Sequence, residues 1–228
     1  MNKVLVIAAH PDDEVLGCGA TIARHVSEGD EVNVIILAEG VTSRSIVRDR
    51  NSSHTELSEL AVIAKRANKL LGVTTLELHD LPDNRLDSVD LLDIIKLIEG
   101  SVKCLKPDVV YTHHAGDVNI DHRRIHEAVI TATRPQPNQS VKQLLFFEVQ
   151  SSTDWQPPCS APSFAPNWYV DVSHTLEMKI EALKIYDSEM REWPHARSIK
   201  AVEYLARWRG ASVGSEAAEA FILGRRLV

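Results

Sequence analysis

Residues 3–14, KVLVIAAHPDDE, join a short apolar run to a turn that carries one histidine and three consecutive acids. The run is rich in Val and Ile, which is typical of a strand buried on both faces of a parallel sheet. In doubly wound α/β proteins, the loop after such a strand lies at the ligand-binding edge of the sheet. A dinucleotide-binding protein carries glycines there, whereas these acids would repel a phosphate. An imidazole beside carboxylates suits a divalent cation instead.

Strands and helices are expected to alternate along the chain after this first strand. Apolar runs predict strands over residues 31–40, 74–81, 107–114 and 143–150. Amphipathic stretches predict helices over residues 17–29, 56–71, 89–105 and 122–134. This alternation is typical of βαβ units, and we therefore predict a Rossmann-like α/β fold with a mostly parallel sheet and helices on both faces.

The C-terminal third begins with a change in composition. Residues 151–167, SSTDWQPPCSAPSFAPN, are rich in proline and predict an irregular surface segment, which we call the proline-rich excursion. It is interpreted either as a lid or oligomer contact, or as a long connection. We expect a C-terminal helical extension and an added strand to follow, with strands over 168–173 and 218–226 and helices over 174–190 and 198–208. No linker separates these parts, so residues 1–228 are expected to form one domain.

Composition limits the classes of function. The formal charge of −7 and the pI near 5.8 argue against a nucleic-acid or anionic-membrane partner. No apolar run reaches the roughly 18 residues of a membrane span, and the N-terminal run lacks the features of a signal peptide. The three cysteines are far apart and without a CxxC pair, which is typical of reduced thiols in a cytoplasmic protein.

A second polar cluster follows the fourth predicted strand, in YTHHAGDVNIDHRRIH, residues 111–126. Because the strands are parallel, this cluster should open on the same edge as the first loop. His122 and His126 have the i,i+4 spacing of a zinc chelate, but Arg123 stands where an HExxH motif has Glu. We favour His122 as a ligand because it lies at the start of a helix, and we interpret His113 and His126 as core or capping residues. Two histidines and one aspartate leave an open position, as catalytic zinc requires.

The chain resembles the LmbE-like or PIG-L family of zinc-dependent de-N-acetylases. The resemblance rests on AHPDDE at 9–14 and GDVNIDHRRIHEAV at 116–129, and extends through LPDNRLD at 81–87, PHARS at 194–198 and AEAFIL at 218–223. It implies that His10, Asp13 and His122 bind zinc and that Asp12 is the general base of an amide hydrolysis. The implied substrate is an N-acetylated amino sugar of the N-acetylglucosamine type, or a conjugate of it.

One departure from the family concerns the second motif. Many members carry His-x-x-His there, and the first of these histidines stabilises the oxyanion, whereas this chain has Asn119. Either the Asn119 amide donates that hydrogen bond or His195 does so, in its own subunit or in a neighbouring one. The alternative for His195 is an exposed turn residue. Asp121, which precedes His122, is predicted to support the metal ligands.

Other residues are predicted to contact the substrate. Asp83, Asn84 and Arg85 follow the third strand, where they could bind sugar hydroxyls or form a turn. Arg44 and Arg48 could contact the substrate or lie in a charged surface loop. The excursion and the C-terminal tryptophans make a homo-oligomer possible. The rival functions are a metal-dependent amidase for a non-sugar amide and a non-catalytic sugar- or nucleotide-binding module.

Overall fold

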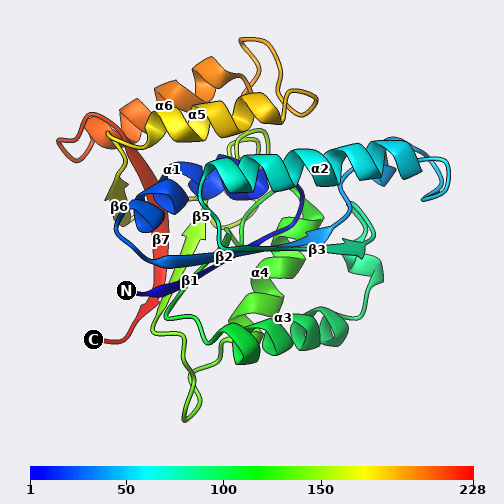
Figure 1. The fold of residues 1–228 in the computed structure, drawn as a ribbon, viewed down its shortest axis with the longest axis horizontal. Coiled ribbons are helices and arrows are strands. Elements are labelled where there is room, and N and C mark those ends of the chain that lie inside the picture. The colour runs from blue at the N-terminus through cyan, green and yellow to red at the C-terminus, as the bar shows by residue number, and fades with distance from the viewer.

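The computed structural model describes residues 1–228, whose strands form one seven-stranded sheet in the order β3-β2-β1-β4-β5-β7-β6 (Figure 1). The first five strands pair in parallel, and β7 is antiparallel to both β5 and β6. The strands are β1 (Lys3–Ala8), β2 (Glu31–Ala38), β3 (Thr75–Leu81), β4 (Val109–His113), β5 (Gln143–Phe147), β6 (Trp168–Asp171) and β7 (Ala218–Arg226). The predicted Rossmann-like architecture is confirmed.

Helices cover both faces of the sheet (Figure 1). One face carries α3 (Leu91–Leu105) and α4 (Ile120–Ala132), and the other carries α1 (Asp13–Ser27) and α2 (His54–Leu70). The C-terminal helices α5 (Leu176–Ile185) and α6 (Ile199–Ala211) form a further layer, in which α5 packs on α1 and α2. Two 3₁₀ turns, η1 (Thr42–Arg44) and η2 (Leu86–Ser88), follow β2 and β3. None of the helices has the length and apolar composition needed to cross a membrane.

The central strand β1 has no exposed face. Val4, Val6 and Ala8 belong to the apolar cluster on the α1 and α2 side, whereas Leu5 and Ile7 belong to the cluster on the α3 and α4 side. Successive side chains of a strand point to opposite faces, so an uninterrupted apolar run fits a strand that helices cover on both sides. The neighbours of β1 are β2 and β4, and strand order reverses between them. Ligands of such sheets bind at this reversal.

Helix α1 begins earlier than predicted and is kinked. The sequence predicts a start at residue 17, but the Asp12 carbonyl already accepts hydrogen bonds from the N–H groups of Val15 and Leu16. At Cys18 the backbone leaves helical geometry, with φ −151° and ψ 25°. A kink of this kind leaves backbone groups on both sides without helical partners, and these need other hydrogen bonds when they are buried.

A buried ion pair satisfies these groups. The Lys179 ammonium donates to the Leu16 carbonyl at 2.7 Å, and the Glu219 carboxylate accepts from the N–H groups of Ala20 and Thr21 at 3.2 and 2.7 Å. Lys179 and Glu219 are 2.6 Å apart and almost fully buried. The Glu of the AEAFIL segment therefore supports the helix that begins at the acidic turn.

Removal of one charge from this pair should destabilise the fold. We expect Lys179→Met to lower the free energy of unfolding by about 3–5 kcal/mol, because it leaves the Glu219 carboxylate buried without its cation. Urea unfolding monitored by tryptophan fluorescence measures the change. Lys184→Met, on the exposed side of the same helix, is the matched control. Equal stabilities of the two variants would contradict this account of the kink.

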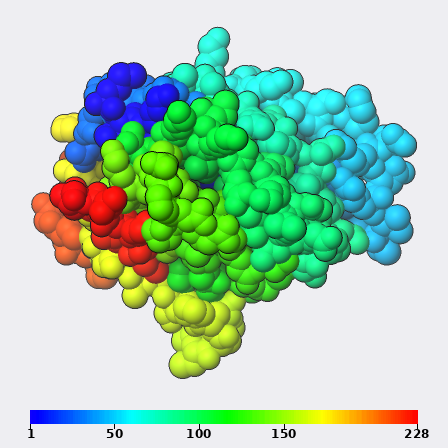
Figure 2. All heavy atoms as spheres, turned by 90° about the horizontal axis from the view of Figure 1, so that it is seen from below, coloured from blue at the N-terminus to red at the C-terminus, as the bar shows by residue number.

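Helix α5 ends earlier than the predicted residue 190. The chain leaves helical geometry at Tyr186, which is fully buried and donates a hydrogen bond from its hydroxyl group to Glu14 at 2.7 Å. The helix therefore stops where Tyr186 enters the core. The proline-rich excursion contains no helix or strand, as predicted, and forms the yellow-green projection at the lower edge of Figure 2.

Candidate metal centre and active site

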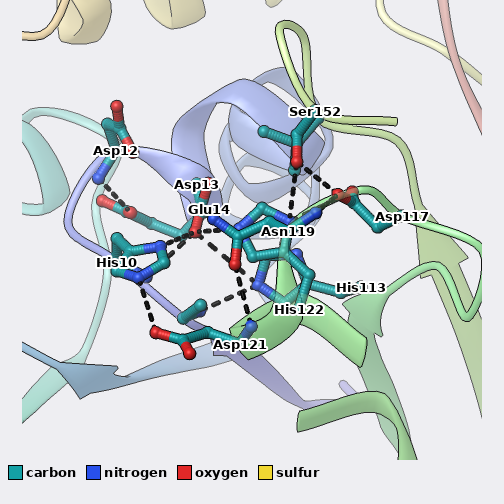
Figure 3. A network of polar contacts seen from close by, with 12 residues as sticks. His10, Asp12, Asp13, Glu14, His113, Asp117, Asn119, Asp121, His122 and Ser152 are labelled. Atoms are coloured by element: carbon teal, nitrogen blue, oxygen red, sulfur yellow. Dashed lines mark hydrogen bonds and ion pairs between the residues drawn. The ribbon is translucent and has the colours of Figure 1, made fainter. Parts of the chain in front are cut away.

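Three predicted ligands converge at the carboxyl ends of β1 and β4 (Figure 3). His10 follows β1, Asp13 begins α1, and His122 lies in the first turn of α4. Asp13 Oδ2 lies 3.2 Å from His10 Nδ1 and 3.1 Å from His122 Nε2. The side chains of Asp13 and His122 are fully buried, and that of His10 is 12% exposed. We call these three residues the ligand cluster.

A carboxylate supports each histidine of the ligand cluster from behind. Asp121 Oδ2 lies 3.0 Å from His10 Nε2, and Asp117 Oδ2 lies 3.0 Å from His122 Nδ1. Each contact leaves the other ring nitrogen facing Asp13. Carboxylates behind ligand histidines orient the rings of metal sites in this way. The structure thus places Asp121 beside a predicted ligand, but this ligand is His10 rather than the sequence neighbour His122.

Asp117 belongs to the polar cluster after β4 that supplies candidate ligands, and the structure places it behind His122. Its carboxylate accepts hydrogen bonds from the hydroxyl groups of Ser152 and Thr153, the latter at 2.7 Å. Burial alone would raise the pKa of Asp117, but the neighbouring His122 and the hydrogen bonds from Ser152 and the Asn119 N–H group hold it at about 2. The carboxylate is therefore charged when it faces His122. The only sequence signal for this role is that Asp117 lies five residues before His122 in the second motif.

The ligand cluster fits a divalent cation. Asp13 Oδ1 is buried without a hydrogen-bond partner, and the buried His122 Nε2 has only the other Asp13 oxygen near it, at 3.1 Å and without hydrogen-bond geometry. Burial lowers the pKa of His122, but the carboxylates of Asp13 and Asp117 outweigh this effect and raise it to about 9. The cluster therefore attracts positive charge, and a metal ion can take the place of protons there. His10 also belongs to a second cluster of side chains that could hold a metal ion, which it forms with Asp83 and Asp121.

Asp12 lies beside the ligand cluster, and its carboxylate points away from that of Asp13 (Figure 3). Its φ of 119° is rare for a residue with a side chain and costs about 1–3 kcal/mol. Two contacts hold this conformation: the Asp12 N–H group donates to Glu14 at 3.0 Å, and Arg197 Nη1 donates to the Asp12 carboxylate at 2.8 Å. Burial raises the pKa of Asp12, and the Arg197 guanidinium opposes that shift.

Arg197 is a site residue that the sequence analysis missed, although PHARS was singled out. Its Nε donates to the Ser151 hydroxyl at 2.6 Å, which fixes the guanidinium between the excursion and Asp12. His195 lies further out. Its Nδ1 accepts the Arg197 N–H at 3.0 Å, and its ring meets Trp155 edge to face at 5.4 Å. His195 makes no hydrogen bond to Asp12 or to the ligand cluster.

Asn119 caps helix α4. Its Oδ1 accepts the Asp121 N–H at 2.8 Å, and its Nδ2 donates to Asn84 Oδ1 at 2.9 Å. Both ends of the amide are therefore engaged. Two of the three residues predicted after β3 lie at the site: Asp83 Oδ1 is 3.2 Å from His10 Nε2, and Asn84 contacts Asn119. Arg85 points away from the site and donates to the Ile46 carbonyl.

Arg44 and Arg48 both pair with protein carboxylates. Arg44 Nη2 lies 2.7 and 2.8 Å from the two oxygens of Glu189, and Arg48 donates to Glu39 at 2.6 and 3.1 Å. His113 and His126 make structural contacts, as expected. His113 Nε2 accepts the Ala9 N–H at 2.8 Å, and His126 Nδ1 lies 2.9 Å from the His113 carbonyl.

Comparison with known proteins places the chain in a family. A family model described as GlcNAc-PI de-N-acetylase, PIG-L, matches residues 5–133, more than half of the chain. The chain belongs to the PIG-L family. Deacetylases of this family are hydrolases that act on amide bonds.

Curated relatives cover more of the chain than the PIG-L model does. An uncharacterized deacetylase of Escherichia coli, YaiS, is 31% identical over 191 residues, which is 81% of this chain and 90% of the relative. Diacetylchitobiose deacetylase of Thermococcus kodakarensis is 28% identical over 217 residues, 87% of this chain and 76% of the relative.

Solved structures share the fold of this PIG-L protein. N,N'-diacetylchitobiose deacetylase from Pyrococcus horikoshii has a TM-score of 0.78 at 20% identity, covering 98% of this chain and 84% of that one. A 4-carboxy-2-hydroxymuconate hydratase from Pseudomonas putida has a TM-score of 0.74 at 19% identity, covering 100% of this chain and 98% of that one. The fold therefore serves more than one reaction, and the substrate must be argued from the side chains.

Proposed function

We propose that this protein is a metal-dependent hydrolase that removes the acetyl group from an N-acetylated amino sugar of the N-acetylglucosamine type, or from its conjugate. The observation that carries the proposal is the position of Asp12. Its carboxylate is held beside the ligand cluster by Arg197 and is not one of the three ligands. A carboxylate next to a metal position but outside its ligand set is what a general base requires.

Zinc is the proposed metal, and His10, Asp13 and His122 would hold it. When bound, zinc lowers the pKa of water and polarises an acyl carbonyl. The donor set of two imidazoles and one carboxylate leaves room for water and substrate. The carboxylates of Asp121 and Asp117 would keep the two imidazoles oriented and more basic.

Asp12 takes the proton of the attacking water and delivers it to the leaving amine. Arg197 keeps this carboxylate oriented toward the reacting groups, and Glu14 keeps the backbone of Asp12 in its unusual conformation. The oxyanion donor would be His195 or Asn119. His195 is favoured because its Nε2 makes no hydrogen bond, whereas the Asn119 amide is engaged at both ends.

Acetate release by zinc-replete protein tests the proposal. The substrates are N-acetylglucosamine and diacetylchitobiose, and N-acetyl amino acids serve as non-sugar amides. Release from either sugar at a rate well above that from the amino acids supports the proposal. Release from the amino acids alone would favour a non-sugar amidase, and no release by zinc-loaded protein would contradict a deacetylase of these sugars.

Arg197 is expected to act on the rate rather than on substrate affinity. Arg197→Met should lower kcat roughly 10- to 100-fold, because hydrogen bonds to charged groups contribute about 1.5–3 kcal/mol. KM should change little, and Arg197→Lys should restore part of the rate. Steady-state kinetics measure both constants, with Arg191→Met, an exposed residue of the same loop, as the control. A rise in KM with unchanged kcat would instead place Arg197 in substrate binding.

A further inference from the structure

A cavity of about 430 Å³ lies between the proline-rich excursion and helix α6. Its volume is within the range of about 300–1,000 Å³ that small-molecule sites occupy. Ala201, Leu205 and Arg209 of α6 line one side, and the excursion and the last residues before it line the other. No residue of the ligand cluster lines the cavity, so it is separate from the proposed metal centre.

Several contacts hold the excursion in place where it lines the cavity. His114 Nε2 lies 2.8 Å from the Pro162 carbonyl oxygen, and the His114 ring meets Phe164 edge to face at 5.4 Å. Gly116 packs so closely that a Cβ there would come within 1.9 Å of the same carbonyl oxygen. From the other side, the Arg209 guanidinium lies over the Phe164 ring at 5.6 Å. The cavity therefore has a defined wall on each side.

The cavity adjoins the proposed reaction centre. Thr153 lines it and donates to Asp117, the carboxylate behind His122. Ala196 also lines it and directly precedes Arg197, which holds Asp12 at 2.8 Å. The walls of the cavity therefore share residues with the surroundings of the proposed reaction centre, which is where a group attached to the sugar would lie.

The chemistry of the walls selects an uncharged occupant. The charged lining residues are Glu148, Asp154 and Arg209, and Arg209 is paired with Glu148 through two contacts of 2.8 Å. The lining residues therefore include no unpaired cation that could bind an anionic group. Prolines, alanines, Phe164 and Leu205 supply an apolar surface. Gln150 also lines the cavity; it is 7% exposed, and its Oε1 has no hydrogen-bond donor.

We propose that this cavity binds the uncharged group attached to the amino sugar: an aryl or alkyl aglycone, or a second neutral sugar ring, with an apolar face. A hydroxyl or amide group of such an aglycone would pair with Gln150, because a buried acceptor without a partner is unfavourable. This inference rests on the proposed function and narrows its substrate class, since conjugates with phosphate or carboxylate next to the sugar would meet Asp154 without a free cation.

The test compares three substrates with zinc-replete protein: 4-nitrophenyl N-acetyl-β-D-glucosaminide, free N-acetylglucosamine and N-acetylglucosamine 1-phosphate. Burial of the aryl ring should raise kcat/KM about tenfold over the free sugar. The phosphate should give no increase. The proposal is overturned if the aryl group gives no advantage, or if the phosphate gives the larger one.

Substitutions in α6 test whether the higher kcat/KM of the aryl substrate depends on the cavity. Ala201→Phe fills the cavity and should lower the aryl-to-free-sugar ratio of kcat/KM at least about fivefold. Ala211→Phe, at an exposed position of the same helix, should leave the ratio unchanged. Gln150→Met removes the unpaired acceptor at similar volume and should not lower the ratio, because the nitrophenyl group has no hydrogen-bond donor for that acceptor. A ratio that Ala201→Phe leaves unchanged overturns the proposal.

Binding without turnover separates this proposal from the proposed function. Saturation-transfer NMR detects the nitrophenyl ring on zinc-loaded Asp12→Asn protein, with and without Ala201→Phe. If no substrate releases acetate but the ring signal is present and Ala201→Phe abolishes it, the cavity assignment holds and the proposed reaction fails. A ring signal that Ala201→Phe leaves unchanged overturns the cavity assignment, whatever the reaction.

Discussion

Asp12→Asn is expected to lower kcat for acetate release by roughly 10²- to 10⁴-fold, the range that general-base groups contribute. Asparagine has the shape of aspartate and can still accept the Arg197 hydrogen bond, so the fold and the strained backbone should persist. It cannot take a proton from water. Because Asp12 is not a member of the ligand cluster, the zinc content of the variant should equal that of the wild type.

Kinetics and metal analysis on the same samples check both parts of this prediction. Asp87→Asn, an exposed aspartate in η2, is the matched control and should retain full activity. If Asp12→Asn kept its activity within tenfold of the wild type, the base would have to be another group. If it lost zinc together with activity, Asp12 would belong among the ligands.

His122→Ala is expected to abolish both metal binding and activity. The substitution removes one of three ligand atoms and leaves the charged carboxylates of Asp13 and Asp117 facing each other without the imidazole between them. Zinc content measured by mass spectrometry after dialysis should fall from about one ion per chain to near zero, because structural and catalytic zinc sites need their full set of protein ligands.

The matched control is His126→Ala, four residues further along α4. The i,i+4 spacing would permit a chelate with His122, but the His126 ring contacts the His113 carbonyl instead. Zinc content and activity should therefore survive this substitution. Loss of zinc from His126→Ala, with retention in His122→Ala, would overturn the proposed ligand set.

The fold and part of the site follow from the sequence because the signals are local. The buried run before HPDDE predicts β1, and parallel strands bring the loops after β1 and β4 to one edge. This topology alone brings His10, Asp13 and His122 to the same edge, whatever their side-chain conformations. The predicted start of α1 at residue 17 was wrong, because the helix begins within the acidic turn, where Asp12 supplies the first carbonyl.

The missing parts of the site depend on contacts between distant segments. Arg197 and Asp12 are 185 residues apart in the chain, and nothing near Asp12 specifies which cation will reach it. The carboxylate of Asp117 is fixed by hydroxyl groups after β5, which pair with it only once β4 and β5 lie side by side. Local patterns cannot encode such contacts, because they follow from the packing of the excursion and α6.

The ion pair inside the kink of α1 also bears on how this protein could be divided or recombined. Residues 5–133 match the family model, yet the helix that begins at the acidic turn depends on Lys179 and Glu219, far downstream. A fragment ending near residue 133 would leave that helix with unsatisfied hydrogen-bonding groups. We therefore expect the fragment not to fold into an active enzyme. Chimeras should instead retain the last sixty or so residues, about a quarter of the chain, because the N-terminal part that matches the family model depends on them.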